Sequence, residues 1–199
     1  MSYKSKFFIG VDLGKLRDHS ALAVIERYTE KTGYDRVYHC DAVETRTVLR
    51  MIEQIRLGTS YPAVIDRICD VVAKIAEKGP CTVIVDATGV GQPVVDALRK
   101  REPDCQLIPV TITGGDQAHG LNIPKSDLLV SLQMMVANAE LRIPHQLRFR
   151  KTLVEELTKI GRNLKAIGNG HDDLVMAVAL ACWQARQHRT IGAQGRRLL

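Results

Sequence analysis

Two aspartates close apolar segments of the chain. Asp12 ends the run Lys6–Asp12 (KFFIGVD), and Asp86 ends the run Cys81–Asp86 (CTVIVD). Ligand sites in open α/β sheets form beyond the carboxyl ends of the strands, and neighbouring strands lie ~4.8 Å apart. If the two runs are parallel neighbours, their carboxylates face one small space and repel each other unless a proton or a cation lies between them. Two divalent cations, which sit ~3.5–4 Å apart in such sites, would fit there.

The segment His171-Asp172-Asp173 supplies a third acidic element, directly before a long apolar run. Capping and the helix macrodipole explain one aspartate in a first helical turn. They explain less well a pair that follows a histidine and opens a wholly apolar helix. Because such a helix is buried, its N-terminus points into the protein, and we expect it to face the same cation site. Carboxylate oxygens select Mg²⁺ or Mn²⁺ over zinc, and a pair of these ions can promote in-line hydrolysis of a phosphodiester.

Five segments predict strands of a mixed sheet. The strands are expected at residues 6–12, 20–28, 34–46, 81–86 and 106–113. Short polar turns at 13–19 and 29–33 join the first three strands and predict an antiparallel meander. A right-handed crossover then returns the fourth strand parallel to the first. Pro109 favours an edge position for the fifth strand.

Five helices are expected around this sheet. The first two are expected at 61–79 and at about 91–101, and the last from 171 to about 187. The third follows Lys125 and carries Leu128, Leu129, Leu132 and Val136 on one side. The fourth carries Val154, Leu157 and Ile160. Thr152 and Glu155 suggest a capping box for the fourth helix. The last helix is apolar nearly all round, so we expect it to be buried. The order of elements predicts one α/β domain over residues 1–190 and a basic, flexible tail at 191–199.

The composition suits one ordinary globular domain. The 199 residues are 45% hydrophobic and carry a formal net charge of +6, which provides a core and is compatible with a polyanionic partner. The five cysteines are scattered without a CxxC or CxxH pair, which argues against a zinc site. The N-terminus lacks a signal-peptide hydrophobic region, and the longest apolar run is too short to span a bilayer. We therefore expect a cytoplasmic protein with no membrane contact.

Four blocks of the sequence resemble the nuclease domains of phage terminase large subunits. In chain order they are GVDLGKLRDHSALAVIE, VIVDATGVGQPVVDAL, IPKSDLLVSLQMMVANAELRIP and GHDDLVMAVALACW. The resemblance implies a ribonuclease H-like fold, here a mixed five-stranded sheet flanked by helices, and a helix with a short strand in the third block. It also implies two divalent metal ions, Mg²⁺ or Mn²⁺, and an endonuclease that cuts concatemeric double-stranded DNA during packaging.

The same resemblance assigns roles to individual residues. It implies that Asp12 and Asp86 are catalytic metal ligands. It adds one or both of Asp172 and Asp173 without separating them. Lys125 matches a basic position in the family's I/V-P-K block, which implies a contact with the DNA backbone; a solvated lysine before a helix is the alternative.

Two more basic residues, Lys15 and Arg17, border the Asp12 turn. They are candidates for phosphate contacts, and a solvated turn is the alternative.

The resemblance to phage terminases also implies partners other than DNA: a separate packaging ATPase, a small terminase subunit and a portal. It also implies a place in the cytoplasm of a bacterial host.

The sequence departs from the family in two respects. No GxxxxGK[ST] P-loop occurs in it, so the translocating ATPase half is not encoded here. The chain is then either an isolated nuclease domain or a stand-alone relative. The segment between Glu156 and His171 is short, and the extra β-hairpin that related domains often hold there is not expected.

Three other functions are open at this point. Actin- and sugar-kinase-type ATPases also begin with a strand and an Asp-x-Gly turn and use a glycine-rich second turn, as in VDLG and DATGVG. Turn geometry alone explains such glycines, and these ATPases need two domains. Holliday-junction resolvases share the fold and the late acidic helix but need a dimer and branched DNA. The third alternative is a non-catalytic scaffold in which the acidic residues are redundant.

Overall fold

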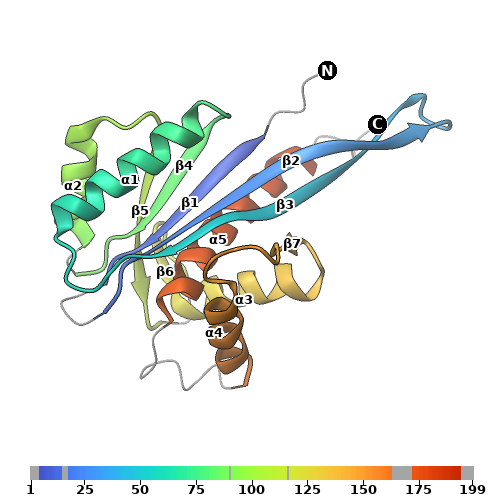
Figure 1. The fold of residues 1–199 in the computed structure, drawn as a ribbon. Helices are drawn as coiled ribbons and strands as arrows, with labels where there is room; N and C mark the ends of the chain where they lie inside the picture. Colours follow the sequence, from blue (N-terminus) through green and yellow to red (C-terminus); the bar gives the residue numbers. More distant parts are fainter. Residues whose placement is uncertain (1–4, 15–17, 90, 116, 163–171, 194–199) are drawn as a thin grey trace.

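The computed structural model consists of one mixed β-sheet with helices on both faces (Figure 1). It describes residues 5–14, 18–89, 91–115, 117–162 and 172–193. The strands are β1 (Lys6–Asp12), β2 (Ala21–Asp35), β3 (Cys40–Gln54), β4 (Cys81–Asp86), β5 (Gln106–Thr113), β6 (Asn122–Pro124) and β7 (Leu141–Arg142). The helices are α1 (Tyr61–Ala76), α2 (Gly91–Arg101), α3 (Lys125–Ala137), α4 (Arg150–Arg162) and α5 (Asp173–Ala193).

The sheet of the described residues has seven strands in the order β6-β5-β4-β1-β2-β3-β7. Strands β1 to β3 form the expected antiparallel meander, and β4 lies parallel to β1 as expected. The expected number of five strands is wrong because β6 and β7, with three and two residues, are too short to carry a strand pattern. The edge position expected for β5 is also wrong, since β6 pairs with Thr111 to Thr113, beyond Pro109.

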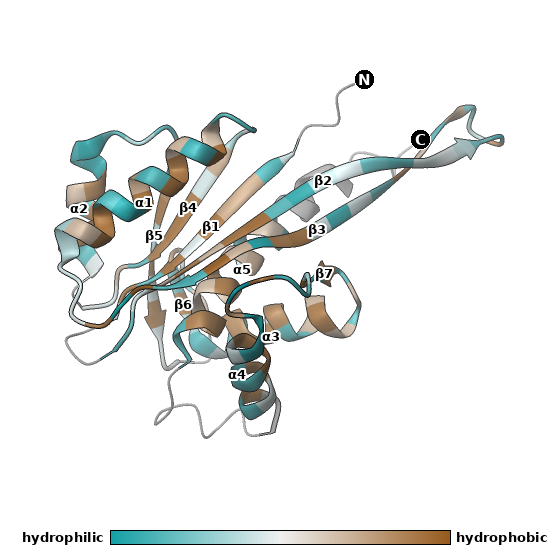
Figure 2. Cartoon of the chain, in the orientation of Figure 1, coloured by the Kyte–Doolittle hydropathy of each residue, from teal (hydrophilic) through white to brown (hydrophobic). Residues whose placement is uncertain are grey.

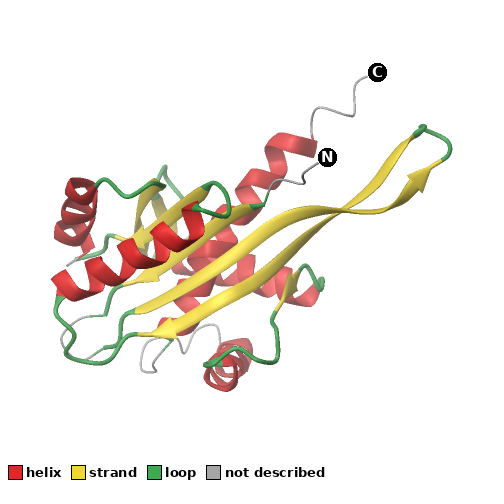
Figure 3. Cartoon of the chain, turned by 45° about the horizontal axis from the view of Figure 1, so that its top comes forward, coloured by secondary structure: helices red, strands yellow, loops and turns green. Residues whose placement is uncertain are grey.

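The meander continues into a long two-stranded arm, residues 29–46, that projects past the rest of the sheet (Figures 1 and 3). The turn expected at 29–33 is wrong, because these residues continue β2 to Asp35. The chain instead reverses at residues 36–39, and β3 then runs on to Gln54.

Cross-strand contacts explain why this polar segment forms strands. Lys31 Nζ lies 2.6 Å from Asp41 Oδ1, and Arg46 Nε lies 2.6 Å from Glu30 Oε1 on the opposite strand. Pairing of this kind stabilises sheets and here overrides a composition that is typical of turns. No residue of the arm is buried.

The sheet separates two apolar cores, one on each face. Alternate residues of β1 point to opposite sides: Ile9 and Val11 pack with α1 and α2, whereas Phe8 packs with α3 and α5. The hydrophobic colouring is concentrated on the central strands and fades along the arm (Figure 2). The centre of the sheet is therefore held between two helical layers, and the arm lies outside both.

Two helices match the buried face expected of them only in part. In α3, Leu128, Leu129 and Leu132 are buried as expected, but Met135 is buried in place of Val136, which is 42% exposed. The fourth helix begins at Arg150, which places Thr152 inside it and excludes the expected capping box. As a result Leu153 is fully buried in place of Val154.

Helix α5 is buried along its first half, as its apolar sequence predicts. Every residue from Leu174 to Cys182 is at most 3% exposed. The helix continues to Ala193, beyond the end expected near residue 187. No helix among the described residues combines the length and hydropathy needed to cross a membrane.

Candidate metal centre

Asp12 and Asp86 end neighbouring parallel strands, as predicted. In the β1–β4 register the last aligned pair is Val11 with Val85, and each aspartate follows its valine directly. Both aspartates are partly buried. Two short apolar strands, buried on both faces, therefore deliver two carboxylates to the same edge of the sheet.

The close packing of α5 on β1 brings the second pair of aspartates to this edge. A Cβ atom on Gly10 would lie 1.9 Å from the carbonyl oxygen of Ala177, so only a glycine permits this approach. Asp173 begins the helix one turn before Ala177, and Asp172 precedes it. The N-terminus of α5 thus points toward the end of β1 that carries Asp12.

The other three aspartates lie close enough to Asp12 to act on its charge. Burial is the largest cause that raises the pKa of Asp12 well above its usual value, followed by the charges of Asp86, Asp173 and Asp172. The charge of Lys125 acts in the opposite direction and lowers this pKa. The four aspartates singled out from the sequence therefore share one acidic centre.

Lys125 also lies at this centre, where it contacts an aspartate directly. Its Nζ donates to Oδ2 of Asp172 at 2.6 Å, and the two side chains are 33% and 23% exposed. Lys125 is the first residue of α3, directly after β6. The alternative of a freely solvated lysine is therefore wrong.

Glu156 is a fifth acidic residue beside the centre, and it was not expected from the sequence. It comes from α4, is 5% exposed, and its Oε2 accepts a hydrogen bond from the backbone N–H of Val175 at 3.1 Å. Burial, and then the charges of Asp173 and Asp172, raise its pKa to about 7, although the backbone bonds act against this. The sequence carried no signal for it, because the apolar face expected of this helix was Val154, Leu157 and Ile160.

The turn after β4 has its own supports. Oδ1 of Asp86 accepts a hydrogen bond from the backbone N–H of Thr88 at 2.8 Å, and the Thr88 hydroxyl accepts one from Ile112 on β5 at 2.9 Å. A Cβ atom on Gly91 would lie 2.1 Å from the Asp86 carbonyl oxygen. Close backbone packing thus explains this glycine without a bound phosphate.

The donor chemistry of the centre fits a hard divalent cation. Its aspartates offer only oxygen ligands, which suit Mg²⁺ or Mn²⁺. As arranged, no three acidic, histidine or cysteine side chains of the described residues form a group that could hold one ion. The contacts of Asp172 with Lys125 and of Asp86 with Thr88 orient two of these carboxylates.

Three residues considered in the sequence, Lys15, Arg17 and His171, lie outside the described residues.

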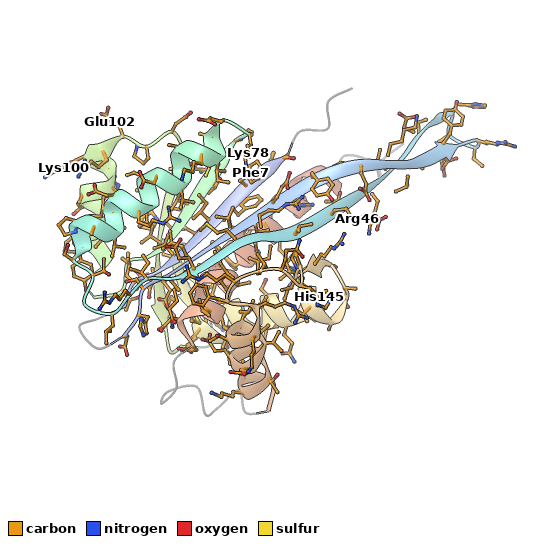
Figure 4. The ribbon with its side chains drawn as sticks, in the orientation of Figure 1. Phe7, Arg46, Lys78, Lys100, Glu102 and His145 are labelled. Atoms are coloured by element: carbon orange, nitrogen blue, oxygen red, sulfur yellow. The ribbon has the colours of Figure 1, made fainter. Side chains whose placement is uncertain are left out.

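A cleft of about 980 Å³ is lined by Arg27, Arg46, Leu141 and Ala185, among others. Its lining comes from β2, β3, β7, α3 and α5, and Arg46 is labelled in Figure 4. Arg27 pairs with Lys6 at the start of β1, whereas Asp12 ends that strand. The acidic centre and this cleft are separate features.

Known proteins resemble the chain over most of its length, although no family model matches it. The terminase large subunits of Thermus phage G20c and Thermus virus P23-45 are each 24% identical over 183 residues. The match covers 88% of this chain but 31% of each relative, so the chain spans about a third of their length.

Solved terminase nucleases share the architecture. The large terminase nuclease from phage G20c with bound zinc matches at a TM-score of 0.55 and 23% identity, over 90% of this chain and 81% of that one. The same nuclease with bound magnesium gives a TM-score of 0.53. The human cytomegalovirus terminase nuclease domain gives 0.55 at 13% identity, over 95% of this chain and 87% of that one. The chain therefore has the fold of viral terminase nuclease domains, which confirms the resemblance in its sequence.

Proposed function

We propose that this chain is a metal-dependent endonuclease that hydrolyses phosphodiester bonds of double-stranded DNA, as in the cutting of viral concatemers during genome packaging. The observation that carries the proposal is the convergence of four aspartates on one edge of the sheet. The mutual repulsion of these carboxylates would be relieved by a cation among them. The likeness to terminase nucleases supports the same activity.

The four aspartates, Asp12, Asp86, Asp172 and Asp173, would be the catalytic metal ligands. We propose two ions, Mg²⁺ or Mn²⁺, and the similar nuclease from phage G20c, which was solved with zinc and with magnesium, supports a divalent metal. When bound, such ions activate water and offset the charge on the scissile phosphate. The chain's own part is to hold the carboxylates in place through β1, β4 and the N-terminus of α5.

DNA would approach this edge through basic residues. Lys125 lies at the centre, and we propose that it contacts the DNA backbone together with Lys15 and Arg17. The net charge of +6 supports binding to a polyanion. We also propose a separate packaging ATPase, a small terminase subunit and a portal as partners, and the cytoplasm of a bacterial host as the place of action.

Cleavage of linear double-stranded DNA with Mg²⁺ or Mn²⁺ tests the proposal. Asp12→Asn and Asp86→Asn should each lower the rate at least about 100-fold, because bound metal supplies several kcal/mol and each 1.36 kcal/mol is tenfold. Neither change should unfold the protein, since each removes one charge from a repulsive cluster. Mn²⁺ should raise the melting temperature of the wild type and raise it less in the variants.

Asp70→Asn, on the exposed side of α1, is the matched control and should cleave like the wild type. Cleavage by the wild type in excess chelator would falsify the metal-dependent mechanism. Full activity of Asp12→Asn would show that the acidic centre takes no part in cleavage. Preference for four-way over linear DNA would favour a resolvase.

A further inference from the structure

The position of Lys125 is unfavourable for its own helix. It is the first residue of α3, where the positive end of the macrodipole disfavours a cation. Asp127, in the same turn, is of the type that the dipole favours. Interactions outside the helix must therefore offset the cost of the lysine.

The acidic centre provides these interactions. The Lys125 ammonium lies 2.6 Å from Asp172 Oδ2, and each of the two side chains is at least two-thirds buried. Its charge also stabilises the ionised form of Asp12, which three neighbouring carboxylates oppose. Lys125 is thus a positive charge built into a cluster of negative ones.

A divalent cation bound at the same cluster would oppose the Lys125 ammonium in two ways. It would compete for the Asp172 oxygen that Lys125 now holds, and like charges at short range would repel each other. Lys125 extends from the start of α3 on a flexible stem, so its ammonium can leave Asp172 without any movement of the helix.

We propose that Lys125 is an internal counter-cation that competes with the metal for Asp172. Metal loading displaces the ammonium, which then becomes available to a DNA phosphate. The inference rests on the proposed function, because it takes the aspartates as metal ligands. It adds a regulatory role for a residue that is otherwise only a candidate DNA contact.

Titration with Mn²⁺ at pH 8 without DNA, followed by calorimetry, tests the competition. Lys125→Met keeps the aliphatic stem and removes the charge, and Lys125→Gln keeps a hydrogen-bond donor to Asp172. Both variants should bind Mn²⁺ at least about fivefold more tightly than the wild type, the lower end of usual coupling between sites. Without metal they should melt at a lower temperature, and Mn²⁺ should raise that temperature by more.

Two controls separate charge from position. Lys125→Arg keeps the charge and should bind Mn²⁺ like the wild type. Lys151→Met removes a lysine whose side chain is 92% exposed on α4, and it should change nothing. Unchanged or weaker Mn²⁺ binding in both Lys125→Met and Lys125→Gln would overturn the inference, since a purely structural tie between α3 and α5 predicts that result. Absence of Mn²⁺ binding by the wild type would instead contradict the proposed function.

Discussion

At the scale of single residues, the acidic centre gathers like charges, and nearby groups offset part of the cost. Lys125 supplies a full positive charge, and the N-terminus of α5 supplies a partial one. Glu156 differs from the aspartates because it accepts hydrogen bonds from that N-terminus while buried. Burial outweighs these bonds and raises its pKa to about 7. The Glu156 carboxyl therefore becomes charged only near neutral pH.

The raised pKa of Glu156 predicts a pH-dependent gain from Glu156→Gln. The pKa of the Glu156 carboxyl is higher in the folded protein, about 7, than the usual value of 4.5. Its contribution to stability is therefore fully present below pH 4.5 and is lost as the pH rises through about 7. The amide cannot ionise and suffers no such loss. The variant should match the wild type at pH 4 and exceed its free energy of unfolding at pH 8 by up to about 3 kcal/mol.

Urea unfolding in chelator at pH 4, 6 and 8 measures this difference for Glu156→Gln. Glu155→Gln is the control, because Glu155 is exposed on the same helix and its contact with Lys151 is a surface ion pair at 4.0 Å. Its effect should be small at every pH. A constant difference for Glu156→Gln across the three pH values would contradict the prediction.

At the scale of elements, the site depends on how closely α5 lies on β1. The backbone of the helix passes over Gly10, where a methyl group would be 1.9 Å from the Ala177 carbonyl oxygen. The atoms that a methyl group on Gly10 would meet are backbone atoms of α5, which cannot rotate aside as the end of a flexible side chain can. The positions of Asp172 and Asp173 relative to Asp12 thus depend on one missing side chain.

Gly10→Ala should destabilise the protein by at least about 3 kcal/mol, because overpacking in a core costs 1–3 kcal/mol and here the obstacle is backbone. Separation of α5 from β1 should also shrink the rise in melting temperature caused by Mn²⁺. Thermal and urea unfolding measure both effects.

Gly33→Ala is the matched control for the strand glycine. No atom lies within 4 Å of a Cβ built there, so the change should alter stability by no more than about 1 kcal/mol. Equal losses of stability at the two positions would show that the close contact between α5 and β1 does not determine the effect of Gly10→Ala.

The sequence predicted these central elements better than the peripheral ones. The bounds of β1 and β4 were predicted correctly, because apolar runs buried on both faces stand out from polar neighbours. The arm was predicted only in part: residues 40–46 form a strand as expected, but the turn was placed at 29–33, because ion pairs across the arm hold strands of turn-like composition. β6 was missed because it is too short for a pattern, and β7 was expected only from the family resemblance of the third block, as a short strand outside the five-stranded sheet.

The acidic centre was predictable in part for related reasons. Each aspartate stands next to a strong local signal, the end of an apolar strand or the start of an apolar helix. The contact of Lys125 with Asp172 joins residues 47 positions apart, and that of Glu156 with Val175 depends on how α4 docks. Neither contact has a local pattern, so only the tertiary structure reveals the partners.

At the scale of the whole molecule, the arm stands apart from the two cores and from the acidic centre. Its outer part, residues 31–43, carries two basic and two acidic residues, which cancel: Lys31, Arg36, Asp35 and Asp41. The net charge that would attract DNA therefore resides in the rest of the chain. The tip instead exposes apolar side chains, with Val37 80% and Tyr38 78% exposed. These features predict that the arm contributes to neither stability nor DNA affinity.

Replacement of residues 31–43 by Asn-Gly tests this separation. Glu30 and Glu44 are paired across the arm, so a two-residue turn between them suits an antiparallel hairpin. The shortened protein should melt within a few degrees of the wild type, since the removed segment contains no buried residue. Its affinity for linear DNA should fall with salt along the same slope, because that slope follows the number of phosphates neutralised. A shallower slope would place Lys31 or Arg36 on the DNA, and a large drop in melting temperature would show that the arm supports the core.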